Sequence, residues 1–178
     1  MGLDISFVNK INFESRGYVS DDADNKVYLY PNDSLLNQSE GILSGEYESF
    51  GMHGSFRAGS YSGYSTWRRT LAAMIGWSNL QDLWTKVETL VQRNESLNDV
   101  LNENDDVSIN IPFIELLNFS DCEGFIGPKT SAKLRADFLE WDERAKNFEA
   151  GDSYFYRLYK EWSNAFNVAS DGGCVMFH

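Results

Sequence analysis

Residues 57–69 combine arginines, hydroxyl side chains and glycines ahead of a helical pattern. The N–H groups at a helix N-terminus attract anions, and arginine binds phosphate or carboxylate through paired hydrogen bonds. We therefore expect a site for a small anionic ligand, with the ligand-binding residues Arg57, Ser60, Ser62, Arg68 and Arg69. The segment lacks the Gly-Lys-Ser/Thr ending of a P-loop. The alternative interpretation is a capped helix whose arginines pair with acidic residues of 94–127.

A second segment, residues 118–127, places Asp121, Cys122 and Glu123 in succession ahead of another helical pattern. Either carboxylate is a candidate general base or ligand of a hard cation, but the spacing is not that of an EF-hand. Cys122 is a candidate nucleophile if a histidine lies beside it, although the adjacent carboxylates oppose thiolate formation. The alternative interpretation is a turn in which Cys122 packs inward.

Histidines are scarce, because His53 and His178 are the only two in the chain. A catalytic triad or a zinc site would have to use one of them, and His178, which follows a short strand-like run, is a candidate catalytic residue. Two cysteines and two histidines without ligand spacing predict no structural zinc. We expect no metal and no cofactor, and we expect both cysteines to be reduced.

The elements that would position these residues follow from hydrophobic periodicity. Residues 1–56 contain short alternating runs typical of antiparallel strands, notably 5–13, 26–30 and 46–56. Apolar residues at helical spacing follow from about 66, from 79, from 128 and from 153, and residues 107–111 and 174–177 have strand composition. We predict one α+β domain over 1–178, with a β-rich part at 1–56 and a mainly helical part at 57–178. The helical part would hold about four amphipathic helices and a short C-terminal strand.

Charge and composition exclude several classes of protein. Fifteen basic against 27 acidic residues give a net charge of −12, which argues against a nucleic-acid binder. The beginning of the sequence has no signal-peptide pattern, and no apolar run is long enough to span a membrane. We therefore expect an acidic cytoplasmic protein without nucleic-acid or membrane partners. The sequence does not predict an oligomeric state.

Three motifs in order resemble a family of small uncharacterised bacterial and phage proteins. They are Met-Gly-Leu-Asp-Ile-Ser at 1–6, Gly-Ser-Tyr-Ser-Gly-Tyr at 59–64 followed by Trp67 and Arg68, and Phe-Ser-Asp-Cys-Glu-Gly-Phe-Ile at 119–126. The final Phe177 and His178 are also similar to the ends of these proteins. The resemblance implies a bacterial or phage cytosolic origin, but it implies no reaction and no catalytic residue.

Our leading hypothesis is a binding protein with a polar cleft formed by 57–69 and 120–127, whose partner is a small anionic ligand. One alternative is a hydrolase or transferase that uses Asp121 or Glu123 as acid, base or metal ligand. Another is an inhibitor or interaction protein that binds a protein partner through its acidic surface. The sequence alone does not decide whether the protein is an enzyme.

Overall fold

The larger of two antiparallel sheets has the strand order β5-β1-β7-β6. Its strands are β1 (Gly2–Val8), β5 (His53–Ser60), β6 (Gly124–Ile126) and β7 (Cys174–Phe177). Side chains alternate along β1, so that Leu3, Ile5 and Phe7 are buried while Asp4 is exposed. This computed structural model describes residues 2–20, 23–93, 111–119, 123–148 and 153–178.

The smaller sheet contains β2 (Ile11–Asn12), β4 (Gly45–Ser49) and β3 (Lys26–Leu29), in the order β2-β4-β3. Two short 3-10 helices, η1 (Phe13–Ser15) and η2 (Asp33–Ser39), lie in its connections. One face of this sheet packs against β1, β6 and β7 of the larger sheet through a second, smaller hydrophobic cluster. That cluster consists of Val8, Ile11, Val27, Leu29, Tyr47, Phe125, Cys174 and Met176.

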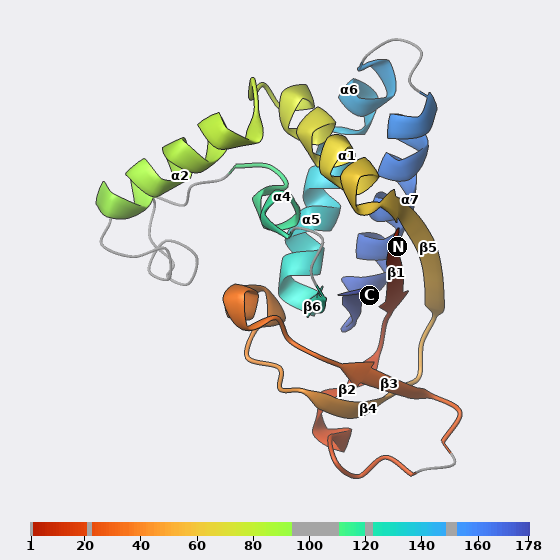
Figure 1. Ribbon diagram of the computed structural model, residues 1–178. Coiled ribbons are helices and arrows are strands. Elements are labelled where there is room, and N and C mark those ends of the chain that lie inside the picture. Colours follow the sequence, from red (N-terminus) through yellow and green to blue (C-terminus); the bar gives the residue numbers. More distant parts are fainter. Residues whose placement is uncertain (1, 21–22, 94–110, 120–122, 149–152) are drawn as a thin grey trace.

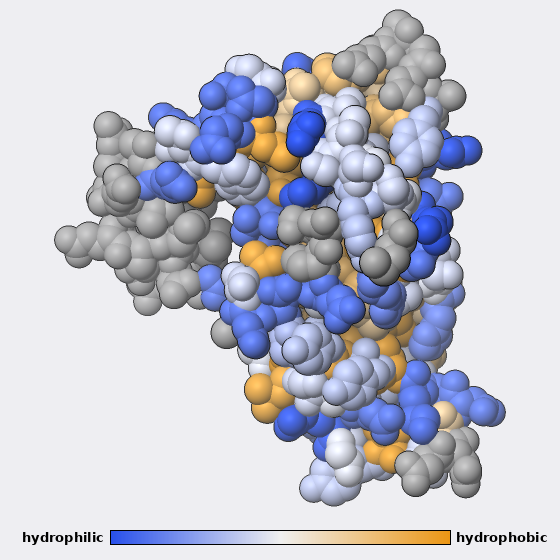
Figure 2. Space-filling view, viewed as in Figure 1, coloured by the Kyte–Doolittle hydropathy of each residue, from blue (hydrophilic) through white to orange (hydrophobic). Residues whose placement is uncertain are grey.

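The helices lie on one side of the larger sheet, and α2 projects from the rest of the molecule (Figure 1). They are α1 (Tyr61–Met74), α2 (Leu80–Arg93), α4 (Ile114–Asn118), α5 (Pro128–Glu140), α6 (Asp142–Asn147) and α7 (Ser153–Ala169). The prediction of a single α+β domain with antiparallel strands in its first part, and a short strand at 174–177, is confirmed. Among the described residues, no helix is both long and apolar enough to cross a membrane. On the face shown in Figure 2, hydrophilic residues surround smaller areas of hydrophobic residues.

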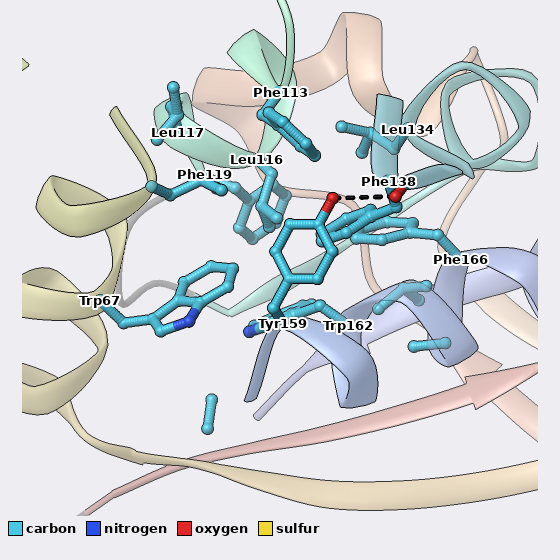
Figure 3. Packing of buried hydrophobic residues seen from close by; sticks show 14 of the residues in the cluster. Trp67, Phe113, Leu116, Leu117, Phe119, Leu134, Phe138, Tyr159, Trp162 and Phe166 are labelled. Carbon is cyan, nitrogen blue, oxygen red and sulfur yellow. Dashed lines mark hydrogen bonds between the residues drawn. The ribbon is translucent and has the colours of Figure 1, made fainter. Parts of the chain in front are cut away.

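Aromatic side chains fill the space between the helices and the larger sheet (Figure 3). Trp162 of α7 is fully buried and contacts the rings of Tyr64, Trp67 and Phe177. The hydroxyl group of Tyr159 donates a hydrogen bond of 2.8 Å to the carbonyl oxygen of Phe138. Burial raises the pKa of Tyr159 far above its usual value, so this hydroxyl group stays a neutral donor. The apolar stripes predicted from sequence are therefore core.

Three local predictions are wrong. The first helix begins at Tyr61 with Ser60 as its cap, and not near Thr66, because β5 pairs with β1 as far as Ser60. The long helix predicted from 128 to 148 is divided at Trp141 into α5 and α6. The loop predicted at 118–127 contains β6, which pairs with β7. Of the strand predicted at 107–111, residues 107–110 lie outside the described residues.

Candidate functional site

A pocket of about 290 Å³ lies where the chain passes from β5 into α1. It is bounded by one face of α1 and by the first turn of α7 (Figure 1). A hydrogen bond of 3.3 Å joins the two helices, in which Trp67 Nε1 donates to the carbonyl oxygen of Phe155. The lining residues are Ser60, Ser62, Gly63, Thr66, Trp67, Thr70, Tyr154 and Phe155. Two of the five predicted ligand-binding residues, Ser60 and Ser62, therefore share one pocket.

Helical spacing gathers the hydroxyl groups of the pocket, because Ser62, Thr66 and Thr70 follow one another at i, i+4 and i+8. Ser60 Oγ accepts a hydrogen bond from the Gly63 N–H at 3.0 Å and lies 3.1 Å from Ser62 Oγ. The hydroxyl groups of Thr66 and Thr70 donate to the carbonyl oxygens one turn earlier, of Ser62 and Thr66. The hydroxyl groups are thus held in place before any ligand arrives.

A glycine at the end of β5 allows Tyr154 to reach the pocket. Gly59 has a φ of +111°, a backbone conformation that residues with a Cβ atom rarely adopt. A Cβ atom at this position would lie 3.1 Å from Tyr154 Oη. Any larger residue would be strained and would press on the tyrosine. The glycines of this segment stand out in the sequence, but nothing in the sequence predicts that an aromatic residue from 154 joins them.

The electrostatics of the pocket favour negative charge. None of the eight described residues that line it is acidic, although the chain carries a net charge of −12. The positive end of the α1 dipole points into this region. The guanidinium group of Arg157 lies 5.4 Å from the centre of the Tyr154 ring. Exposed Arg69 lies about two helical turns after Ser62, on the same side of α1.

The other predicted arginines lie elsewhere. Arg68 is buried between α1 and α4, where Nη1 donates to the carbonyl oxygen of Leu117 at 2.8 Å and the guanidinium group stacks over Tyr64. Its Nε atom is buried and has no hydrogen-bond partner among the described residues. Arg57 lies on the sheet and forms an exposed ion pair of 3.3 Å with Asp4. The structure therefore brings neither residue into the pocket.

The second predicted segment is only partly described, because Asp121 and Cys122 lie outside the described residues. Glu123 is exposed and directly precedes β6, at the edge of the sheet opposite to β5. With about 4.8 Å between neighbouring strands, these edges lie about 14 Å apart. The structure thus does not bring Glu123 and Arg57 together. His178 extends β7 and contacts Ser6, with Nε2 2.6 Å from Oγ.

Metal and thiol chemistry find little support among the described residues. No three His, Cys, Asp or Glu side chains in the described part of the chain gather closely enough to hold a metal ion. Cys174 is a free thiol in the smaller hydrophobic cluster. Burial, and secondarily the carboxylate of Glu40, raises the pKa of this thiol far above its usual value. Cys174 is therefore an inert core residue and not a nucleophile.

This burial predicts the reactivity of Cys174. In the Cys122→Ser variant, where Cys174 is the single thiol, we expect the folded chain to react with an aromatic disulfide reagent at least about 10³-fold more slowly than the chain unfolded in urea. The measurement is the rate of release of the coloured thiolate. Fast labelling without denaturant would show that the cluster opens locally.

Comparison with known proteins does not assign the site. No family model matches the chain, and neither the curated proteins nor the solved structures include a significant match. A functional assignment therefore rests on the geometry of the chain itself.

Proposed function

We propose that the protein is a binding protein for a small anionic ligand, which occupies the pocket at the beginning of α1. The observation that carries the proposal is a hydroxyl-lined pocket in a strongly acidic chain, with no acidic side chain among the described residues that line it. In such a chain, a surface site free of carboxylates reduces the repulsion that an anion would otherwise meet.

The size and chemistry of the pocket suggest the class of ligand. At about 290 Å³ it lies at the lower end of the range of small-molecule sites, which runs from about 300 to 1,000 Å³. Phosphate or carboxylate oxygens would face the first N–H groups of α1 and the hydroxyl groups of Ser60 and Ser62. Arg157 would contact the ligand from α7, and the Tyr154 ring would cover its less polar part. A small phosphorylated or carboxylated metabolite fits this description.

The proposal predicts stabilisation by small anions. At a concentration 100 times its dissociation constant, a bound ligand adds about 2.7 kcal/mol, which raises the melting temperature of a chain of this size by about 5–10 °C. The measurement is a thermal-shift series with phosphate, pyrophosphate, citrate and adenosine monophosphate at constant ionic strength. Sodium chloride at matched ionic strength is the control for general screening.

Three variants locate the site of any shift. Arg157→Gln and Thr66→Phe are expected to abolish the shift, because the first removes the cation and the second fills the pocket. Arg144→Gln is the matched control, since Arg144 lies over Trp141 at 5.3 Å as Arg157 lies over Tyr154, but Tyr154 lines the pocket and Trp141 does not. The proposal fails if none of the anions shifts the melting temperature, or if Thr66→Phe binds as well as the wild type.

A further inference from the structure

A serine and a histidine meet on the larger sheet, on strands from opposite ends of the sequence. Ser6 Oγ of β1 lies 2.6 Å from the Nε2 atom of His178, although the two residues are 172 positions apart. Backbone hydrogen bonds hold the histidine in this position, since the His178 N–H donates to the Asp4 carbonyl oxygen at 2.9 Å and the Asp4 N–H donates to the His178 carbonyl oxygen at 3.4 Å. Strand pairing therefore builds the contact.

The pair lies on the polar face of β1. Leu3, Ile5 and Phe7 belong to the main core, so the alternation directs Asp4 and Ser6 to the opposite face. In the neighbouring strand β5, Ser55 is paired with Ser6 and Arg57 with Asp4, and both are exposed. A serine, a histidine, an arginine and a carboxylate thus share one accessible face of the sheet. The pocket at α1 uses none of them.

We propose that Ser6 is a nucleophile and His178 its general base in acyl transfer from carboxylic esters. Ser6 Oγ attacks the ester carbonyl carbon and forms a C–O bond while its proton passes to His178 Nε2. The bond to the leaving oxygen then breaks, and that oxygen takes the proton and departs as an alcohol. Water attacks the acyl-serine in the same way, which releases the carboxylic acid and returns a proton to Ser6.

The geometry supplies the nucleophile and the base that this step requires. A serine hydroxyl group is a weak nucleophile unless a base accepts its proton within about 2.6–3.2 Å, and His178 Nε2 is at the short end of this range. In the register of β1 and β5, Arg57 is the diagonal neighbour of Ser6, at about 7–8 Å between backbone positions. Its guanidinium group, however, pairs with Asp4 and lies against Gly2, on the side away from Ser6, so the proposed step depends on Ser6 and His178.

The accessibility of this face indicates the class of substrate. Asp4, Ser55, Arg57 and His178 are all exposed. An ester group carried on a larger molecule can therefore reach Ser6 without entering an enclosed pocket. We expect esters with good leaving groups to react fastest, because the described residues at this face include no acid beyond the protonated histidine that could assist departure.

Covalent labelling tests the proposal. The chain of residues 1–178, without a tag, is incubated with a fluorophosphonate, which phosphonylates activated serines, and the adduct is located by mass spectrometry of peptides. We expect one adduct, on Ser6, and hydrolysis of p-nitrophenyl acetate that the label abolishes. Ser6→Ala should lose both, whereas Ser55→Ala, which removes the paired serine on the same face, should keep both.

A variant of His178 distinguishes a general base from a residue that only holds Ser6 in place. His178→Gln can still hydrogen-bond to Ser6 but accepts no proton, so labelling should slow by about 10²-fold or more, while His53→Gln should react like the wild type. Circular dichroism confirms that each variant is folded. Absence of an adduct on Ser6, or equal labelling rates in wild type and His178→Gln, would overturn the proposal. Neither outcome affects the anion pocket, which these variants leave intact.

Discussion

Replacement of Trp162 by alanine is expected to lower the free energy of unfolding by about 3–5 kcal/mol, a large part of the stability of an ordinary domain. The side chain is fully buried among the aromatic rings of the core (Figure 3). Its ring lies 5.0 Å from Phe56, 5.8 Å from Trp67 and 5.5 Å from Phe177, measured between centroids. Removal would leave a cavity that these rings can fill only in part.

Urea unfolding followed by circular dichroism measures the effect. The loss should come from packing, because the buried Nε1 atom of Trp162 has no hydrogen-bond partner in the described part of the chain. Trp162→Phe should therefore lose much less than the alanine variant. Leu139→Ala is the control for an exposed position, since Leu139 is 62% exposed, and should change stability by no more than about 0.5 kcal/mol. A loss below about 1 kcal/mol for Trp162→Ala would show that the core rearranges around the cavity.

The second large effect concerns a buried carboxylate. Asp137→Ala is expected to lower the free energy of unfolding by about 1–3 kcal/mol, because it takes the acceptor away from the buried N–H group of Phe113. Lys133 keeps its ion pair of 2.8 Å with Glu115. Asp137 Oδ2 lies 2.8 Å from Lys133 Nζ and accepts a hydrogen bond of 2.8 Å from the Phe113 N–H. Phe113 caps α4 in the left-handed region, with a φ of 60°, so this hydrogen bond holds an unfavourable backbone conformation.

Two further variants separate the charge from the hydrogen bond. Asp137→Asn keeps an acceptor for the Phe113 N–H and should lose less than the alanine variant. Asp4→Ala breaks an ion pair with Arg57 in which the two side chains are 59% and 61% exposed, and should cost no more than about 1 kcal/mol. Equal losses for Asp137→Ala and Asp4→Ala in urea unfolding would contradict the role assigned to burial.

Hydrophobic periodicity predicted those strands and helices whose pattern lies within their own sequence. The alternation in 5–13 and 26–30 and the helical stripes of 79–93 and 153–169 correspond to strands and helices. Asn79 caps α2 as its side chain predicts, since Asn79 Oδ1 accepts from the Asp82 N–H. The start of α1 was misplaced because Ser60, Ser62, Ser65 and Thr66 are all acceptable caps, and only the pairing of Gly2 with Ser60 selects between them.

The candidate sites depend more on distant contacts. The serines of the pocket could be predicted from the hydroxyl-rich composition of 57–69. Tyr154 and Phe155 come from α7, whose sequence gives no sign of a ligand contact. Ser6 was not predicted as a site residue, because its partner His178 is 172 positions away and is brought to it only by strand pairing. Strand β6 has only three residues, too few for periodicity to distinguish from a loop.

The position of β7 between β1 and β6 has a consequence for the order of folding. β1 has no sequence neighbour in its sheet, because it pairs with β5 on one side and β7 on the other. The chain between β1 and β5, and between β1 and β7, must be closed into long loops before these strands pair. Closing such loops costs conformational entropy before any contact compensates for it, so the sheet has a high contact order and folds slowly. The helices can form from local contacts, whereas the larger sheet closes only when residues 174–177 insert. Until then, both β1 and β6 expose an unpaired edge, and a partly folded chain is open to edge-to-edge association.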